Sequence, residues 1–120
     1  MRAHVLGVFP YDPGDRQVRG PASMQFRRDQ PFAARVDWGA LPAGTVVSAQ
    51  WYNSLDEAVG GIDRDSAGAL AGRDALVAVR TPPGYHANLP GHYTLVIVRY
   101  AGGQPVELLA RTTVLVARDP

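Results

Sequence analysis

The stretch spanning residues 89–100 constrains the fold of this chain more than any other. A Pro-Gly pair ends the segment before it, and a run of β-branched and aromatic residues follows, which is typical of a β-strand. Every second residue from Tyr93 to Ile97 is apolar and large, so these side chains share one face of the strand. We expect this face to point into a hydrophobic core.

Other strands are predicted from alternating apolar and polar residues between turn signals. The alternation is clearest over residues 32–38 and 45–52. Further strands are predicted over residues 3–9, 22–27, 73–81 and 106–117, with turns rich in Pro and Gly between them. The sequence allows two interpretations of segment 53–72. One is a single capped helical turn near its start, and the other is a hairpin that turns at the glycine pair 60–61.

The spacing of the strands favours an all-β fold, namely an antiparallel sandwich of about seven strands. Parallel strands need crossovers of about a dozen residues or more, and the chain has no room for them. With 120 residues, the chain is predicted to form one domain over 1–120. We expect residues 1–29 to form an N-terminal strand and an edge segment, and residues 30–117 to form the core of the sandwich.

Composition excludes several classes of function. The chain has no cysteine, and its net charge is +1, with 12 basic and 11 acidic residues. A near-neutral chain gives no electrostatic reason to bind nucleic acid, and no apolar run approaches the ~20 residues that span a membrane. We therefore expect neither nucleic acid nor a membrane span. The compartment stays open: extracytoplasmic if Met1 begins a fragment, cytoplasmic otherwise.

Two aromatic residues carry a resemblance to a known fold family. Trp51 stands on the third strong strand and Tyr93 at the start of the sixth, and with them the chain resembles the cysteine-free bacterial branch of immunoglobulin-like β-sandwich domains. The resemblance covers residues 30–117. It implies that Trp51 packs in the core between the sheets and that the Tyr93 hydroxyl bonds to backbone a few residues upstream. It also implies roles in adhesion, scaffolding or ligand display.

Catalytic and metal-binding signals are weak. No serine lies in a nucleophile motif, and His86 and His92, six residues apart, lack an obvious third metal ligand. Four carboxylates between Asp56 and Asp65 suggest calcium, but their spacing does not match a calcium-binding loop, and a solvated loop is favoured. The sequence predicts no enzyme, no cofactor and no metal site, with calcium at this loop left open.

The outward face of the central strand is the strongest candidate for binding. If its odd-numbered residues point inward, an unusually apolar row faces outward, and the last strand is expected to extend it. The candidate interface residues are Val96, Val98, Tyr100, Leu109 and Leu115. We expect this patch to contact a protein partner, an adjoining domain or a second copy in a homodimer. The alternative is that residues 10–30 fold back over it.

Exposed aromatic rings support a second function. Sandwich domains that bind carbohydrate stack sugar rings on such side chains, and the candidates here are Trp38, Tyr52, Tyr85 and Tyr100. The alternative is that Trp38 completes a core face and that Tyr85 packs a loop. The sequence therefore predicts a non-enzymatic interaction or scaffolding module, with a carbohydrate-binding module as the alternative.

Overall fold

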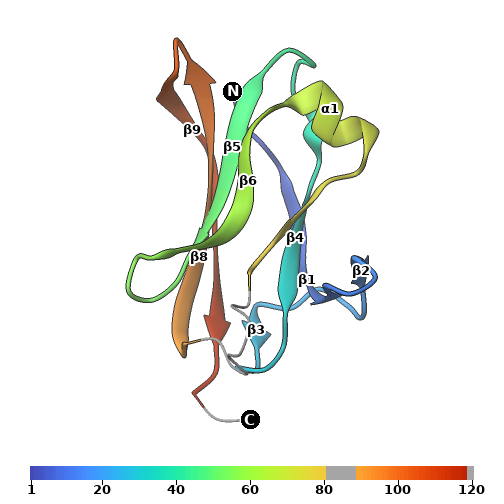
Figure 1. Ribbon diagram of the computed structural model, residues 1–120, viewed down its shortest axis with the longest axis vertical. Coiled ribbons are helices and arrows are strands. Elements are labelled where there is room, and N and C mark those ends of the chain that lie inside the picture. Colours follow the sequence, from blue (N-terminus) through green and yellow to red (C-terminus); the bar gives the residue numbers. More distant parts are fainter. Residues whose placement is uncertain (81–88, 119–120) are drawn as a thin grey trace.

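The computed structural model describes residues 1–80 and 89–118, which form a sandwich of two β-sheets (Figure 1). The all-β prediction is confirmed, although these residues form nine strands rather than about seven. The strands are β1 (Val5–Asp12), β2 (Gln17–Val18), β3 (Gln25–Phe26), β4 (Phe32–Val36), β5 (Val46–Tyr52), β6 (Ala58–Ser66), β7 (Leu76–Ala78), β8 (Gly91–Ala101) and β9 (Gln104–Val116). A 3-10 turn, η1 (Trp38–Ala40), and a short helix, α1 (Ala67–Gly72), complete the fold.

The strands divide into a four-stranded and a five-stranded sheet. The first has the order β2-β1-β4-β7 and the second the order β3-β9-β8-β5-β6. All pairings are antiparallel except that of β3 with β9, which is parallel. The central strand predicted near residues 92–100 is β8, which lies between β9 and β5.

An aromatic cluster fills the space between the sheets. The ring of Phe32 lies edge-on to Trp51 at 5.2 Å and to Tyr93 at 5.7 Å, and it stacks on Phe26 at 4.7 Å between centroids. At most 2% of each of the four residues is exposed. The indole N–H of Trp51 donates to the Val77 carbonyl at 2.8 Å, which ties β5 of one sheet to β7 of the other. Trp51 therefore occupies the core position that the sequence predicts.

Segment 53–72 follows neither interpretation of the sequence. The β5–β6 hairpin turns before the glycine pair, because the Asn53 side chain accepts hydrogen bonds from the backbone N–H groups of Leu55 and Glu57. Gly60 and Gly61 lie inside β6. Strand β6 then leads directly into α1, where the Ser66 hydroxyl caps the helix by accepting from the N–H of Ala69.

Three other predicted boundaries need correction. Strand β1 continues past Pro10 to Asp12 and forms a hairpin with β2, whereas the sequence predicts a turn from Pro10 onward. The strand predicted over 32–38 ends at Val36, and Trp38 belongs to η1. The predicted strand over 73–81 is reduced to the three residues of β7 within the described part of the chain.

Candidate interaction surface

The outer face of the five-stranded sheet carries a row of half-exposed side chains on β8. Tyr93, Leu95 and Ile97 are buried, as predicted, and the alternate residues Val96 and Val98 face away from the core with intermediate exposure. Polar residues flank this row on one side, since Ser48, Gln50 and Tyr52 of β5 pair with Val98, Val96 and Thr94. The central strand is therefore apolar on both faces.

Strand β9 contributes differently from the prediction. Ile97 pairs with Ala110 but Val98 pairs with Leu108, so Leu109 is an extra residue in the ladder. Between this bulge and the β8–β9 turn, the inward and outward positions of β9 are exchanged. Leu109 therefore turns inward and is 4% exposed, whereas Leu108 turns outward and is 58% exposed. The prediction that Leu109 faces outward is therefore wrong, and Leu108 faces outward instead.

Arginines border the apolar row at both sides of the sheet. The guanidinium of Arg64, on β6, lies 4.5 Å above the centroid of the Tyr100 ring and covers one side of it. On β9, the exposed Arg111 pairs with Val96 across the ladder. Leu115 is 37% exposed, faces outward as predicted, and lies at the far end of the row. We define the outer face by the row Val96, Val98 and Leu108 and by these bordering residues.

The N-terminal segment takes a route away from this face. The Arg19 N–H donates to the Pro10 carbonyl and the Ser23 N–H to the Val8 carbonyl, so residues 19–23 run beside β1 of the other sheet. The chain then reaches the edge of β9 as β3. Figure 1 places β1 and β2 on the side of the molecule away from β8. Residues 10–26 therefore do not cover the outer face, which corrects the alternative drawn from the sequence.

One of the aromatic residues proposed for sugar stacking, Trp38, is buried in the core. Trp38 is 2% exposed, and its indole N–H donates to the Ala75 carbonyl at 2.9 Å, so it has no face for a ligand. That assignment is wrong, and Trp38 belongs to the core. Tyr52 is half-buried beside the outer face, and Tyr85 lies outside the described residues.

Two of the four carboxylates between Asp56 and Asp65 are engaged with neighbouring side chains. Glu57 accepts a hydrogen bond from the Asn53 amide at 2.9 Å, and Asp65 pairs with Arg73 at 3.0 Å. The hydrogen bond from Arg73, aided by a backbone N–H, holds the pKa of Asp65 below its usual value. Over residues 1–80 and 89–118, no group of three His, Asp or Glu side chains is placed to hold a metal ion. The pair His86 and His92, for which the sequence offers no third metal ligand, includes a residue outside the described part.

Tyr93 lies at the start of β8, with the backbone of Leu89, four residues upstream, near its hydroxyl. Burial of the ring raises the pKa of Tyr93 to about 12, an effect that the nearby Leu89 backbone partly opposes. Tyr93 is thus buried at the start of the strand that carries the apolar row.

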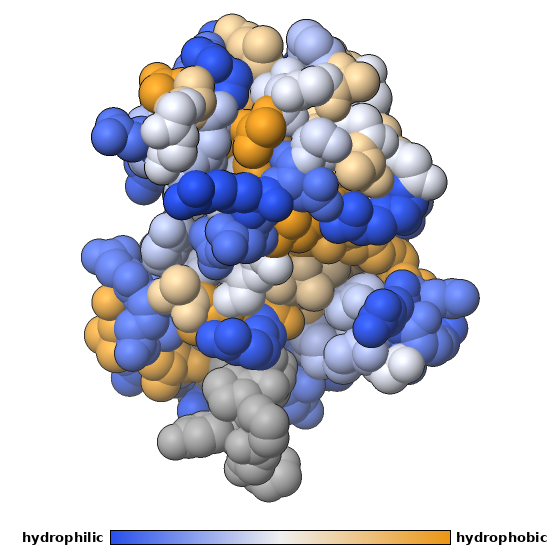
Figure 2. Space-filling model, turned by 45° about the horizontal axis from the view of Figure 1, so that its top comes forward, coloured by the Kyte–Doolittle hydropathy of each residue, from blue (hydrophilic) through white to orange (hydrophobic). Residues whose placement is uncertain are grey.

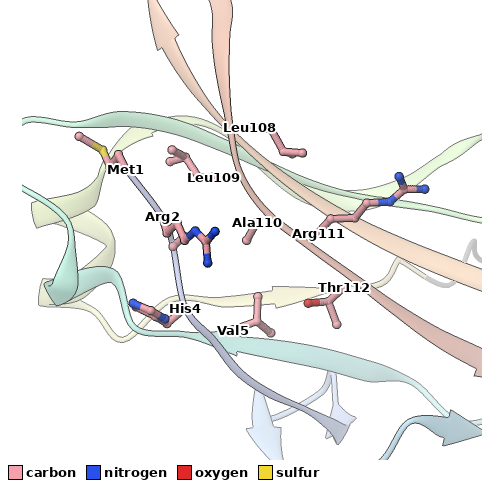
Figure 3. Close-up of a pocket in the computed structure, with 10 residues that line it drawn as sticks. Met1, Arg2, His4, Val5, Leu108, Leu109, Ala110, Arg111 and Thr112 are labelled. Carbon is pink, nitrogen blue, oxygen red and sulfur yellow. The ribbon is translucent and has the colours of Figure 1, made fainter.

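A groove of about 510 Å³ lies beside β9, at the edge where the two sheets open (Figure 3). The N-terminal segment forms one wall, and the middle of β9 forms the other. Figure 3 shows Arg2 between the two walls, near Ala110, with Val5 and Thr112 along the groove. Sequence reasoning missed this groove because alternation along a strand does not say which strands lie at an edge.

The remaining surface mixes hydrophilic and apolar side chains. Figure 2 shows apolar groups in a hollow across the middle of the face it presents, between bands of hydrophilic residues. Among the described residues, no helix is long and apolar enough to cross a membrane. No protein-family model, curated protein or solved structure matches the chain.

Proposed function

We propose that the chain is a non-enzymatic interaction module with an immunoglobulin-like fold, and that the outer face of its five-stranded sheet is the contact surface. The strand order supports the fold assignment. Strands β1, β4 and β7 take the places of A, B and E in one sheet of such domains, and β5, β8 and β9 take those of C, F and G in the other. The buried Trp51 on β5 and the buried Tyr93 at the start of β8 fit the same scheme.

One observation carries the contact surface: the apolar row formed by Val96, Val98 and Leu108, which no described segment of the chain covers. The solvent-facing side of an antiparallel sheet is usually polar, and here the middle of that side is aliphatic. Monomeric proteins seldom expose contiguous apolar patches without a binding role. The row also lies on the two longest strands, so its backbone is held firmly by the ladder between β8 and β9.

A second copy of the chain is the proposed occupant. Two sheets pack well face to face at about 10 Å, and a twofold axis through the row would place Val98 of each copy near the centre of the contact. Arg64 and Arg111 lie at opposite sides of the face, so the centre of such a contact contains no like charges. An apolar centre with a charged rim is the usual anatomy of a protein interface.

Substituting Val98→Arg tests this proposal. The half-exposed position allows an arginine to extend its charged end into water in the monomer, whereas a twofold contact would bury two such charges. We expect sedimentation equilibrium to give a dimer for the unmodified chain and a monomer for the variant, with the same circular dichroism spectrum. Val106→Arg, at an exposed site near the β8–β9 turn, is the matched control and should remain dimeric. A monomeric unmodified chain at millimolar concentration would reject self-association.

A further inference from the structure

The outer edge of β9 is bonded at Leu109 and again from Leu115 onward, and it is open between these two points. At one end, the Ala3 N–H donates to the Leu109 carbonyl at 3.0 Å. At the other, the Leu115 N–H donates to the Met24 carbonyl at 2.9 Å, where β3 begins to pair with β9. Between these bonds the N-terminal chain leaves β9 and crosses to the other sheet as β1. In the part of the chain that the structure describes, no strand therefore lies beside the edge between Leu109 and Leu115.

Backbone groups of β9 point into this gap. Alternate residues of a strand direct their backbone N–H and C=O groups to the same side. The backbone groups of Arg111 and Thr113 therefore face the edge, as those of Leu109 and Leu115 do. Within residues 1–80 and 89–118, no backbone hydrogen bond joins Arg111 or Thr113 to a partner on this side. At ~3.3 Å per residue the gap spans about 20 Å, which is room for a strand of four or five residues.

The groove of about 510 Å³ lies along this gap and is cationic. Its lining contains Arg2, His4 and Arg111 but no acidic residue, and Arg2 and Arg111 form no ion pair with the described residues. Its floor is apolar, because Val5 and Ala110 pack against the core from its two walls. Figure 3 shows the Arg2 guanidinium over this floor.

We propose that the groove binds an extended, acidic segment of a partner protein, which adds a short strand to the edge of β9. The unpaired backbone groups of Arg111 and Thr113 would bond to the segment, as in other cases of strand addition to a sheet edge. Apolar side chains of the segment would rest on Val5 and Ala110, and its carboxylates would pair with the arginines. This surface is an edge between the sheets; it shares Leu108 and Arg111 with the outer face proposed above as the contact between copies, but it does not include Val96 or Val98.

The closed ends of the gap make the site selective. Long open edges pair indiscriminately with other strands, and proteins usually block them. Here the N-terminal segment and β3 occupy the two ends, so only a short extended segment fits, and its acidic side chains distinguish it from other strands. The same bonds hold both walls in place before a segment arrives.

The peptide Ac-Glu-Val-Thr-Val-Glu-NH2 is the probe for a titration followed by amide NMR. We expect saturable shifts of the Arg111 and Thr113 amides, and slower hydrogen exchange at both. A peptide with Gln in place of Glu should bind about three- to fivefold more weakly, the size of effect that an exposed ion pair gives. Arg2→Gln should weaken binding of the acidic peptide by a similar factor. Arg80→Gln, at an exposed site outside the groove lining, is the matched control and should leave binding unchanged.

Thr113→Pro tests the strand addition itself. The substitution removes an N–H that faces the edge, and proline is tolerated at such positions of edge strands. We expect the melting temperature to stay close to that of the unmodified chain and peptide binding to be lost. If the variant does not fold, slower exchange of the Arg111 amide in the unmodified chain with peptide decides the question.

Three outcomes would overturn the proposal. The first is the absence of saturable shifts at the Arg111 and Thr113 amides with millimolar peptide. The second is equal affinity for the acidic peptide and its Gln counterpart. The third is a shift of these amides with protein concentration alone in the Val98→Arg variant, which would identify a second copy as the occupant of the groove. Val98→Arg lies on the outer face and should leave peptide binding intact, so failure of the dimer proposal is distinguishable from failure of this one.

Discussion

Phe32 joins the two sheets of this protein at a single side chain. It extends from β4 and contacts the rings of Trp51 and Tyr93, which come from the opposite sheet, and that of Phe26, which comes from its edge. Edge-on and offset ring contacts each add about 0.5–1.5 kcal/mol beyond the area they bury. Packing at this cluster therefore accounts for a large part of the stability of the sandwich.

Trp51→Ala should lower the free energy of unfolding by about 3–5 kcal/mol, the range found when a large buried aromatic side chain is truncated. The residue is fully buried, and its removal also leaves the Val77 carbonyl without its indole donor. Urea denaturation followed by circular dichroism measures the loss. Leu55→Ala, at a site that is 67% exposed, is the control and should change stability little. A cost below about 1 kcal/mol for Trp51→Ala would contradict the packing described.

Tyr93→Phe should cost about 1 kcal/mol near neutral pH, because it removes the polar interaction of the hydroxyl with the Leu89 backbone, which can still reach water since Leu89 is half-exposed. The pH dependence has a definite sign. The pKa of Tyr93 rises from 10.0 to about 12 on folding, so the folded state favours the neutral hydroxyl. This stabilisation is complete below about pH 10 and is lost as the pH rises to 12. The unmodified chain should therefore lose stability faster than Tyr93→Phe between pH 10 and pH 12, and equal slopes would contradict this assignment.

Strand β6 depends on close backbone contact at its glycine pair. A Cβ added to Gly61 would lie 2.1 Å from the Ala49 carbonyl oxygen, a backbone atom of β5 that cannot move aside alone. Gly61→Ala should therefore cost about 2–3 kcal/mol, the upper part of the range for overpacking. Gly72→Ala is the matched control, since nothing lies within 4 Å of its Cβ position, and it should be neutral or slightly stabilising. Thermal unfolding of both variants checks the contrast, and equal melting temperatures would count against it.

Elements with strict alternation could be predicted from the sequence, and irregular ones could not. Strands β5 and β8 lie where the patterns place them, because each presents a buried face to the aromatic cluster. Strand β6 could not be predicted, because its glycines and carboxylates give no apolar alternation. Its residues are stabilised by pairing with β5 more than by burial. The Ser66 cap is a signal that could have indicated α1. The Leu109 bulge has no such signal, because the extra residue is visible only once β8 and β9 are paired.

At the scale of the whole molecule, β9 serves three surfaces at once. Its even-numbered residues from Ala110 face the core, its odd-numbered side chains face the outer surface, and the backbone of Arg111 and Thr113 faces the groove. The sequence predicts the first two from alternation, apart from the shift at Leu109. It cannot predict the third, because the edge is open only where the N-terminal chain leaves β9, and that departure depends on the packing of both sheets.

The two tryptophans of the chain both donate their indole N–H groups to the segment 75–77: Trp38 to the Ala75 carbonyl and Trp51 to the Val77 carbonyl. Both rings are at most 2% exposed, so they lie in apolar surroundings and are shielded from water-soluble quenchers. The intrinsic fluorescence of the protein consequently monitors how tightly this one segment is held by both sheets. Neither proposed contact surface contains an indole, so the emission reports on the integrity of the core independently of whether a partner is bound.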